Sequence, residues 1–412
     1  MAMPLPTTWR IAWRNLWRNP RRTGLALAAI GLSVTLVLLY DGVLRWEADW
    51  MVDTITGPML GHVQAHAREW RRTRSMDKTL RDVSKTVAAL RADPDVAGVD
   101  ARVYAPALAA LGEEGFAVMV MGVDMDEAAR PSRLLAGLAA PIGHRQVLMG
   151  NLLAAQMGVK PGDRIAVVGQ GVDGSLANDL FTVVALLTTQ VDMVNRQALV
   201  MPIGEAQDLF AMSDEAHELV IYGRDVDAAK TLAAHLQQLP ALAGDEVLDW
   251  KAAEPGMNEL VQLVEVMWVF ILVLVFVAAA AGVANTALMS TFERTHEFGM
   301  LLALGTTPSR IVGMIVLESL ALGATGALLG TTLGAALVAW AYRRGIDYAA
   351  LTGGGPTSLS AFGLRWSLVI YPRLAFIDIV RVVAAVMVTS LVASVWPALR
   401  AARLQPARAL RE

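Results

Sequence analysis

Residues 266–292 read VMWVFILVLVFVAAAAGVANTALMSTF, and none of these 27 side chains carries a charge. Three shorter uncharged stretches are found at 23–40, 319–342 and 382–399. A helix of about 20 mainly apolar residues is long enough to cross the hydrocarbon core of a membrane. The sequence therefore predicts four transmembrane helices, at residues 23–43, 264–291, 311–341 and 375–397.

The composition of the chain excludes several classes of protein. Of its 412 residues, 55% are hydrophobic and only 18% are charged, compared with about 25% charged residues in an ordinary soluble domain. The 35 basic and 38 acidic residues give a net charge of −3, without the basic excess typical of nucleic-acid-binding proteins. The absence of cysteine excludes disulfides, thiolate metal sites and cysteine nucleophiles.

The segment between the first two predicted helices, residues 44–263, is predicted to be a separate folded domain. It holds 19 basic and 30 acidic residues, and short strand-like stretches alternate in it with amphipathic helices. This alternation predicts an α+β domain built from two lobes, with the inner lobe at about 144–214. The glycine-rich stretch GQGVDGSLAND, residues 169–179, is predicted to be the loop of a β-hairpin.

Arginines close to the predicted helices indicate how the chain is oriented. Five precede the first helix and four follow the last one: Arg10, Arg14, Arg18, Arg21 and Arg22, then Arg400, Arg403, Arg408 and Arg411. Because basic flanks face the cytoplasm, both termini are predicted to be cytoplasmic, in the inner membrane of the cell. The fold class is then an α-helical membrane protein with four transmembrane helices and a large α+β extracytoplasmic domain between helices 1 and 2. Arg343 and Arg344, in the external loop 342–374, go against this rule.

The N-terminal segment 1–22 is predicted to contain an elbow helix that lies along the cytoplasmic membrane surface. Tryptophans and arginines recur there at helical spacing: Trp9, Trp13 and Trp17, with Arg10, Arg14 and Arg18. Indole rings prefer the headgroup region and guanidinium groups attract anionic lipid, which is typical of an interfacial amphipathic helix. Pro20 ends this helix before the first span. An ordinary basic flank would account for the arginines but not for the regular tryptophans.

A search for catalytic, metal and nucleotide sites gives no support for an enzyme. His62 and His66 have a spacing that would suit a metal on a helix, but they fall in a predicted strand, where they stand about 13 Å apart. The stretch 169–174 lacks the Gly-Lys-Ser/Thr of a P-loop. We therefore predict no catalytic residue, no metal site and no cofactor bound by this chain itself.

Residues 292–310 connect the second and third predicted helices through a short charged turn. Four titratable side chains follow the second helix: Glu293, Arg294, His296 and Glu297. A short apolar helix comes next, and Gly305 and Pro308 end it. Between two long spans, such a turn is a place where a cytosolic partner can dock. A solvated loop without a partner explains the composition equally well.

The third predicted helix carries one acidic residue and a row of glycines. Glu318 lies about 10 Å into the helix, where an ionised acid is costly unless it faces protein or water. We expect it to make a polar contact within the helix bundle or with the cytoplasmic arginines. Gly326, Gly330 and Gly334 form two overlapping GxxxG repeats, which allow close helix packing within one protomer or between two.

The segment after the second helix resembles the coupling region of the FtsX/MacB-type ABC transporter permeases. The matching residues are Asn285, Arg294, Thr295, Glu297, Phe298, Gly299, Ala303, Leu304 and Gly305. The tail 398–412 is also similar to that family, as is the order of elbow helix, one span, large insert and three spans. Residues 345–347 and 369–373 resemble an external loop of the Lol-type lipoprotein-releasing members. The resemblance covers essentially the whole chain.

This resemblance implies a permease subunit that dimerises, with itself or with a second permease, and docks on two copies of a separate cytosolic ABC ATPase. ATP and Mg²⁺ would bind to that ATPase, and its closure would move the external domain, a mechanism called mechanotransmission. The coupling residues implied by position are Glu293, Arg294, Glu297, Phe298, Gly299, Ala303, Leu304 and Gly305.

The substrate and even the functional class stay open at this point. Lipoprotein release to a periplasmic chaperone is the nearest analogy, and other family members export peptides or drugs with a periplasmic adaptor. A membrane signalling or scaffold protein that activates an external partner would explain the insert and the basic flanks. It would not require the charged turn at 293–297.

Overall fold

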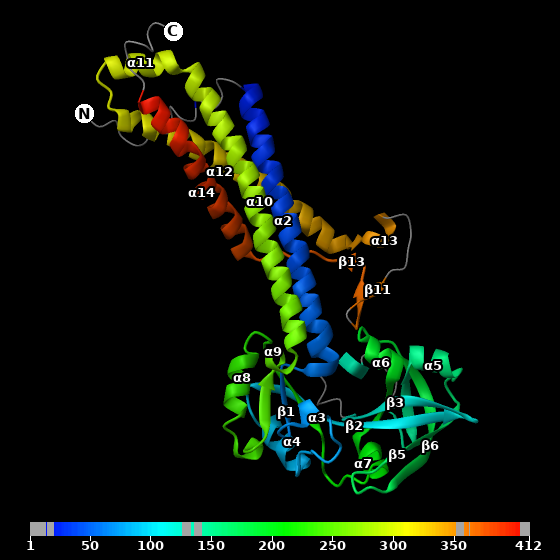
Figure 1. Ribbon diagram of the computed structural model, residues 1–412. Helices are drawn as coiled ribbons and strands as arrows, with labels where there is room; N and C mark the ends of the chain where they lie inside the picture. The colour runs from blue at the N-terminus through cyan, green and yellow to red at the C-terminus, as the bar shows by residue number, and fades with distance from the viewer. Residues whose placement is uncertain are drawn as a thin grey trace. The chain divides into compact units, whose positions relative to one another are not determined.

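The computed structural model of the chain describes residues 14, 20–125, 133–135, 142–351, 358–361 and 363–403. These residues fold into two compact units. The first is helical and takes its residues from 1–48, 262–355 and 368–412. The second contains a large β-sheet and takes its residues from 49–261 and 356–367 (Figure 1).

Within the described residues, four helices are long and apolar enough to cross a membrane. They are α2 (Pro20–Ile55), α10 (Pro255–Glu293), α12 (Pro308–Arg344) and α14 (Phe376–Ala402). The first three each contain one predicted span and extend beyond it at both ends, and α14 begins one residue after the predicted start at 375 and extends beyond the predicted end at 397. The 39 residues of α10 measure about 58 Å at 1.5 Å per residue, against a hydrocarbon core of about 30 Å. Charged residues such as Asp41 end the apolar runs without breaking the helices, because they are tolerated in helical backbone.

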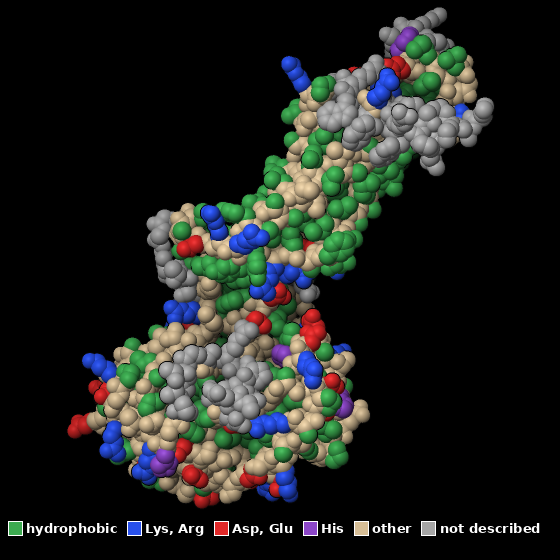
Figure 2. All heavy atoms as spheres, turned by 180° about the vertical axis from the view of Figure 1, so that it is seen from behind, with side chains coloured by type: hydrophobic (Ala, Val, Ile, Leu, Met, Phe, Trp, Pro, Cys, Tyr) green, Lys and Arg blue, Asp and Glu red, His purple; other side chains and the backbone are tan. Residues whose placement is uncertain are grey.

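The apolar side chains of these helices divide into a buried set and an outward set. Ile30, Leu38, Leu322 and Val386 belong to a buried cluster to which several helices contribute. Outward-facing side chains are exposed instead, and they give the helical unit a largely apolar surface (Figure 2); they include Phe270, Leu333 and Val392. Such a surface fits an environment of lipid tails.

Short elements connect the long helices of the first unit. The helix α11 (Thr295–Ala303) lies between α10 and α12. After α12 come β10 (Ile346–Asp347), α13 (Tyr348–Leu351) and β13 (Val369–Ile370), and β10 pairs antiparallel with β13. The predicted external loop 342–374 therefore has secondary structure of its own.

The second unit is built on one nine-stranded sheet with the order β3-β7-β4-β6-β5-β2-β8-β1-β9. Its strands are β1 (Val63–His66), β2 (Val96–Leu111), β3 (Glu114–Val123), β4 (Gln146–Gly150), β5 (Arg164–Gln170), β6 (Leu176–Leu187), β7 (Ala198–Pro202), β8 (Glu218–Gly223) and β9 (Glu246–Asp249). A separate hairpin pairs β11 (Ser358–Ala361) with β12 (Leu364–Ser367).

Helices of the second unit are short. They are η1 (Thr56–Leu60), α3 (Trp70–Thr73), α4 (Val83–Arg91), η3 (Arg133–Leu135), α5 (Asn151–Met157), α6 (Asp192–Gln197), α7 (Ile203–Leu209), α8 (Ala229–Leu236), η4 (Pro240–Leu242) and α9 (Trp250–Ala253). The fold of this unit is therefore α+β. The sequence patterns predicted neither β4 nor α6, because both are too short for a clear period.

The long strand β2 organises the sheet. Its N-terminal half pairs with β8, and its C-terminal half pairs with β3 on one side and β5 on the other. Since β3 also pairs with β7, six strands close into a ring: β2, β3, β7, β4, β6 and β5. One hydrophobic cluster, with Val103 and Phe181, comes mainly from this ring, and another, with Leu219 and Leu232, forms on the β1–β8 side. The sheet is continuous between the two clusters because β2 contributes to both.

The predicted hairpin loop 169–179 is shorter in the structure. Gly169 pairs with Ala177 and Gln170 with Leu176, so only residues 171–175 connect β5 to β6. The ends of β5 and β6 contain glycine and polar residues, as loops do. The predicted loop therefore included residues that belong to the two strands.

Candidate functional site

The predicted coupling segment contains one defined helix, α11, between two of the long apolar helices. The helix α10 ends at Glu293 and α11 begins at Thr295. Arg294 separates them in a non-helical conformation, with φ −111° and ψ 17°. A change of helix direction at a single residue places the Arg294 side chain between the neighbouring helices.

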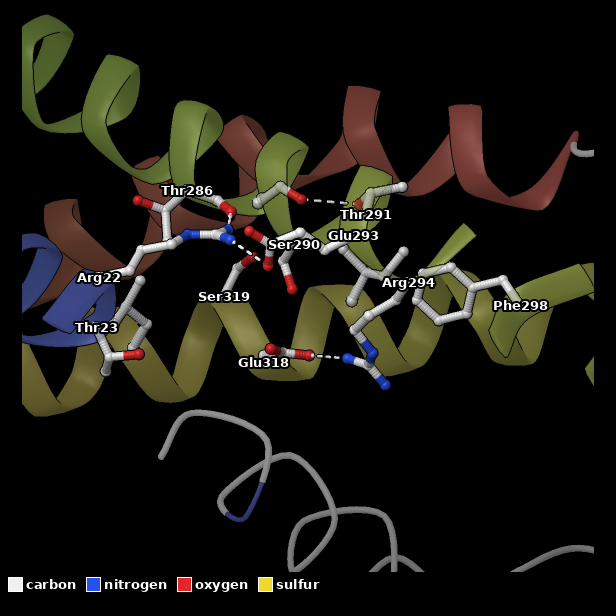
Figure 3. A pocket seen from close by; sticks show the side chains of 13 residues that line it. Arg22, Thr23, Thr286, Ser290, Thr291, Glu293, Arg294, Phe298, Glu318 and Ser319 are labelled. Carbon is white, nitrogen blue, oxygen red and sulfur yellow. Dashed lines mark hydrogen bonds and ion pairs between the residues drawn. The ribbon is translucent and has the colours of Figure 1, made fainter. Parts of the chain in front are cut away.

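Arg294 joins α11 to the long helix α12 through two carboxylates. Its Nε donates to Oε2 of Glu297 at 3.0 Å. Its Nη1 donates to Oε2 of Glu318, also at 3.0 Å (Figure 3). The side chains of Arg294 and Glu318 are 13% and 17% exposed, so little water competes for this pair. An acidic side chain in a membrane helix is unfavourable unless it has a polar partner. The contact of Glu318 with Arg294 supplies that partner.

An apolar contact holds α11 in the same place. Phe298 is 1% exposed and belongs to a cluster with Ile311 and Ile315 of α12 and Ala398 and Ala401 of α14. The Arg294 guanidinium lies 5.1 Å from the centre of the Phe298 ring. Burying a phenylalanine side chain stabilises the packing by about 1.5–3 kcal/mol. The helix α11 is therefore fixed to α12 and α14 by both charge and packing.

The C-terminus of α11 is closed by a glycine. Gly305 has φ +87°, a region that side chains disfavour. Its N–H donates to the Leu302 carbonyl, and the N–H of Thr306 donates to the Leu301 carbonyl, as in a Schellman motif. Of the other residues predicted for coupling, Gly299 is buried in the middle of α11, Ala303 ends the helix, and Leu304 follows it and is 83% exposed.

A second ion pair connects α2 with α10 beside this site. Arg22 Nη1 donates to Glu293 Oε2 at 2.9 Å, and Arg22 also contacts the Thr286 carbonyl. Together with the Arg294 pair it borders a cavity of about 230 Å³, lined by hydroxyl groups of Thr23, Ser290, Thr291 and Ser319 (Figure 3). The Arg22 pair is the more exposed one, because the Glu293 side chain is 54% accessible.

The charged groups at this site contact one another across elements. Each arginine in the cavity wall has a carboxylate partner, so each charge is used in a contact between elements. Displacing α11 would pull directly on Glu318 of α12 and on the packing around Phe298.

The GxxxG glycines of α12 pack against α2 of the same chain. A Cβ on Gly330 would lie 2.5 Å from the Gly31 carbonyl oxygen, and one on Gly326 would lie 2.7 Å from Ile30 Cγ2. A Cβ on Gly334 would lie 3.1 Å from Leu38 Cδ1. Thr35 Oγ1 donates to the Gly330 carbonyl at 3.1 Å, which a larger residue would prevent.

A bidentate ion pair at the other end of the helical unit escaped the sequence analysis. Arg45 of α2 donates from Nε and Nη2 to Asp378 of α14, at 2.9 and 2.7 Å. Asp378 is 1% exposed and also accepts from the Ala375 N–H, which caps α14. The signal in the sequence was an acidic residue in the first turn of a span, but its partner is 333 positions away.

The predicted elbow residues mostly lie outside the described part of the chain. Trp9, Arg10, Trp13, Trp17 and Arg18 are among the residues that are not described, and so is the tail from residue 404. Arg14 is helical and exposed. The elbow helix therefore stays a prediction.

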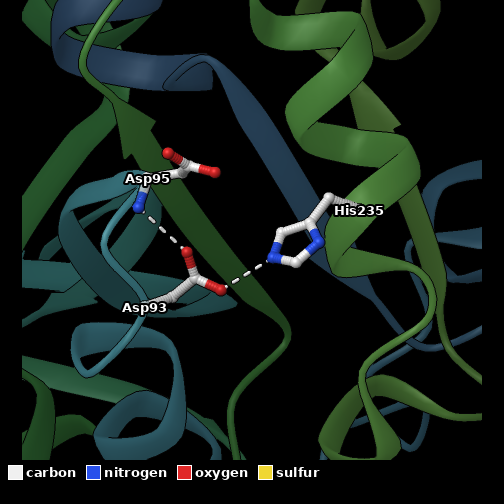
Figure 4. Close-up of side chains that lie close together, drawn as sticks. All are labelled: Asp93, Asp95 and His235. Carbon is white, nitrogen blue, oxygen red and sulfur yellow. Dashed lines mark hydrogen bonds and ion pairs between the residues drawn. The ribbon is translucent and has the colours of Figure 1, made fainter.

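Histidines of the second unit serve the fold. His62 accepts from the Gly223 N–H, and His66 is fully buried beside Glu246, so the two do not share a ligand position. Asp93, Asp95 and His235 do come together, with their possible ligand atoms within 4.8 Å (Figure 4). However, His235 Nε2 already bonds Asp93 at 2.8 Å, which ties α8 to the turn before β2.

A buried aromatic cluster in the second unit contains His66 and a further histidine, His217. Trp70 is 2% exposed and stacks on His217 with ring centres 5.7 Å apart, while His66 lies at 5.9 Å. The Nδ1 of His217 accepts from the Tyr104 N–H, and its Nε2 lies 3.2 Å from the Met76 carbonyl, which defines a neutral tautomer. Burial lowers the pKa of both His66 and His217.

Comparisons with known proteins found similarity to permeases in sequence and a weaker likeness to one periplasmic region in structure. The model of the FtsX-like permease C-terminal domain matches residues 269–406. The lipoprotein-releasing system transmembrane protein LolC of Neisseria meningitidis is 26% identical over 286 residues, which cover 65% of each chain, just under two thirds. LolC of Xylella fastidiosa is 24% identical over 346 residues, covering 81% of this chain and 82% of the relative. The periplasmic region of MacB from Actinobacillus actinomycetemcomitans superposes with a TM-score of 0.35 at 11% identity, over 52% of this chain and 97% of that region.

Proposed function

Because residues 269–406 match the FtsX-like permease C-terminal domain, we propose that this chain is the membrane subunit of an ABC transporter whose ATPase is a separate cytosolic protein. In this proposal, closure of the ATPase on ATP displaces α11, and the long helices carry that movement to the external domain. ATP and Mg²⁺ bind to the ATPase subunits. The permease chain supplies no catalytic residue and no cofactor.

The double contact of Arg294 carries this proposal. One side chain holds Glu297 of α11 and Glu318 of α12, both at 3.0 Å. A force on the short helix therefore reaches a span directly, without passing through a flexible loop. The buried Phe298 and the glycine-closed C-terminus make α11 a small rigid body that a partner can push.

The partners follow from the same proposal. Two copies of the ATPase dock on two permease protomers, which are identical or form a heterodimer. The chain lies in the inner membrane as a multi-pass protein with both termini in the cytoplasm, so that α11 faces the ATPase.

Lipoprotein release or extraction from the inner membrane is the substrate role we propose first. It rests on the relatives, since the two LolC proteins are named for a lipoprotein-releasing system. A periplasmic chaperone would then receive the cargo. Export of a peptide or drug through a periplasmic adaptor is the alternative, and so is activation of an external partner without transport.

Co-purification from native membranes tests the proposal. The chain is extracted in mild detergent with ATP or vanadate present, and stoichiometric partners are identified by mass spectrometry. Recovery of a P-loop ATPase is expected, and its absence under these conditions would favour a sensor or scaffold. A second permease in the complex would indicate a heterodimer.

The role of α11 is then tested in the purified complex. Glu297→Gln should retain the ATPase but lose its stimulation by the permease, because one of the two Arg294 contacts is gone. The matched control is Glu113→Gln, an equally conservative change in the exposed turn between β2 and β3. Full stimulation by the Glu297 variant would contradict the coupling role.

A further inference from the structure

The end of the helical unit away from α11 carries basic and aromatic side chains that coupling does not use. The helix α12 ends with Arg343 and Arg344, and Arg373 lies just before α14. Basic side chains border the apolar surface of the helices there (Figure 2). Under the predicted orientation these arginines lie outside, where the distribution of charges in membrane proteins disfavours them. We therefore expect a specific interaction that stabilises these arginines on that side.

A small ribbon holds these residues together. Ile346 of β10 pairs with Ile370 of β13, directly after Arg344 and directly before the segment with Arg373. At Gly345 a Cβ would lie 3.0 Å from Tyr371 Cε1, so the tyrosine ring packs on the end of α12. The Arg373 N–H donates to the Gly42 carbonyl at 3.0 Å. The two basic segments are thus fixed at one place by backbone contacts.

Within the described part of the chain, the guanidinium groups of the three arginines make no hydrogen bond. All three are exposed, and among the residues that the structure describes none of them makes an ion pair. Arg344 lies over Trp340 at 5.5 Å, and Arg373 lies over Tyr342 at 5.6 Å. A guanidinium that rests on an aromatic ring is held in place and still presents N–H groups to a ligand.

Neighbouring carboxylates do not compete for these groups. Asp347 accepts the N–H of Ala350, and Asp378 is occupied by Arg45 and, at 3.7 Å, by Arg381. Of the carboxylates that the structure describes, none pairs with these arginines, so this end of the helical unit presents positive charge to its surroundings.

Aromatic rings around the arginines indicate the depth at which they lie. Trp340, Tyr342, Tyr348 and Tyr371 are between 41% and 53% exposed. Trp340 and Tyr342 close the uncharged run 319–342, and Arg343 and Arg344 follow at once. Half-exposed tryptophan and tyrosine at the end of an apolar helix are typical of the headgroup region of a bilayer.

We propose that Arg343, Arg344 and Arg373 form a binding surface for the phosphate of an anionic phospholipid, in the leaflet opposite α11. Guanidinium groups bind phosphate oxygens through paired, charge-assisted hydrogen bonds. The half-exposed rings supply apolar contact for the glycerol backbone of the lipid. A bound anionic lipid neutralises the arginines that would otherwise lie on the disfavoured side. The inference is independent of the coupling role of α11.

Quenching by brominated lipids tests this surface. The full chain, which has no cysteine of its own, receives a single Ala350→Cys for a fluorophore on the exposed face of α13. The labelled protein is reconstituted in nanodiscs of phosphatidylcholine with a fixed fraction of brominated phosphatidylglycerol or brominated phosphatidylcholine. Anionic lipid should be enriched around the label by about fivefold for each arginine that contributes.

Two double variants give the decisive comparison. Arg344→Gln with Arg373→Gln should lower the preference by about 25-fold, to the level that Arg343 alone supplies, whereas Arg344→Lys with Arg373→Lys should lower it less because the charge remains. The matched control, Arg68→Gln with Arg164→Gln, removes the same charge from exposed positions of the second unit and should leave the preference unchanged. Equal quenching by both lipids in the unchanged chain would overturn the proposal. So would an equal loss in the control, which would indicate a net-charge effect.

Discussion

At the residue scale, the pair between Arg294 and Glu318 has a predictable energy. Replacing either side chain with glutamine should lower the free energy of unfolding by about 2 kcal/mol, because hydrogen bonds between charged groups are worth about 1.5–3 kcal/mol. The double variant should lose less than the sum of both, since neither Arg294 nor Glu318 is then left charged without the other. Thermal unfolding in detergent measures this cycle. Glu293→Gln is the control, with an effect below about 1 kcal/mol because Glu293 is 54% exposed. Strictly additive losses would show that the two residues do not interact.

The two buried histidines beside Trp70 predict that the second unit becomes less stable as the pH falls. Burial lowers the pKa of His66 and His217, so the unfolded chain binds protons more readily than the folded one. Their stabilising contribution is complete above the unfolded pKa of about 6.5 and is lost as the pH falls through the folded value. Thermal unfolding between pH 7.5 and 5 should therefore show a falling midpoint.

The variant His217→Gln isolates this effect, because glutamine can accept from Tyr104 and donate to Met76 without a titration. In this variant the unfolding midpoint should fall less between pH 7.5 and 5 than in the unchanged chain. Glu218, whose pKa is raised by burial, acts in the opposite sense and is unchanged in both proteins, so it cancels from the comparison. Identical pH profiles for the variant and the unchanged chain would exclude His217 as the source.

Single residues were only partly predictable. The cost of an acid in a membrane helix predicted that Glu318 needs a polar partner, and the nearby charged turn suggested which one. Asp378 with Arg45, and Trp70 with His217, could not be predicted in the same way. Their partners are distant in sequence, and burial of such groups depends on the packing of elements that carry no local signal.

At the scale of elements, the glycines of α12 predict opposite effects for one substitution. Gly330→Ala should destabilise the helical unit by about 1–3 kcal/mol, because its Cβ would lie 2.5 Å from the Gly31 carbonyl oxygen. Gly313→Ala on the same helix meets no atom within 4 Å and should stabilise it by up to about 1 kcal/mol, since alanine favours helix. Unfolding in detergent compares the two. An equal effect of both changes would contradict close packing of α12 on α2.

Helices were easier to predict than the sheet for a physical reason. An uncharged run of 18 residues or more has one stable structure in a membrane, so α2, α10, α12 and α14 were visible in the sequence. Where a strand begins and ends depends on the strands that it pairs with. Gly169 pairs with Ala177, so β5 and β6 extend into a stretch that has the composition of a loop. The closed ring depends on the pairing of β2 with both β3 and β5, which no local pattern reveals.

At the scale of the whole molecule, the orientation in the membrane is the prediction with the widest consequences. The arginines before the first span and after the last indicate cytoplasmic termini, whereas Arg343 and Arg344 point the other way. If the headgroup surface at Arg344 and Arg373 exists, those charges are compensated by lipid and do not determine topology. Four spans then place both termini and α11 on one side, and the sheet domain on the other.

Labelling of single cysteines decides between the two orientations. Asp173, in the tight loop between β5 and β6, and His296, in the first turn of α11, are both exposed and are replaced by cysteine one at a time. In intact spheroplasts an impermeant maleimide should modify the cysteine at position 173 and leave position 296 unmodified until the membrane is opened. Equal modification after opening is the control for reactivity. Modification of position 296 first would reverse the topology, place α11 outside, and remove the cytosolic ATPase as its partner.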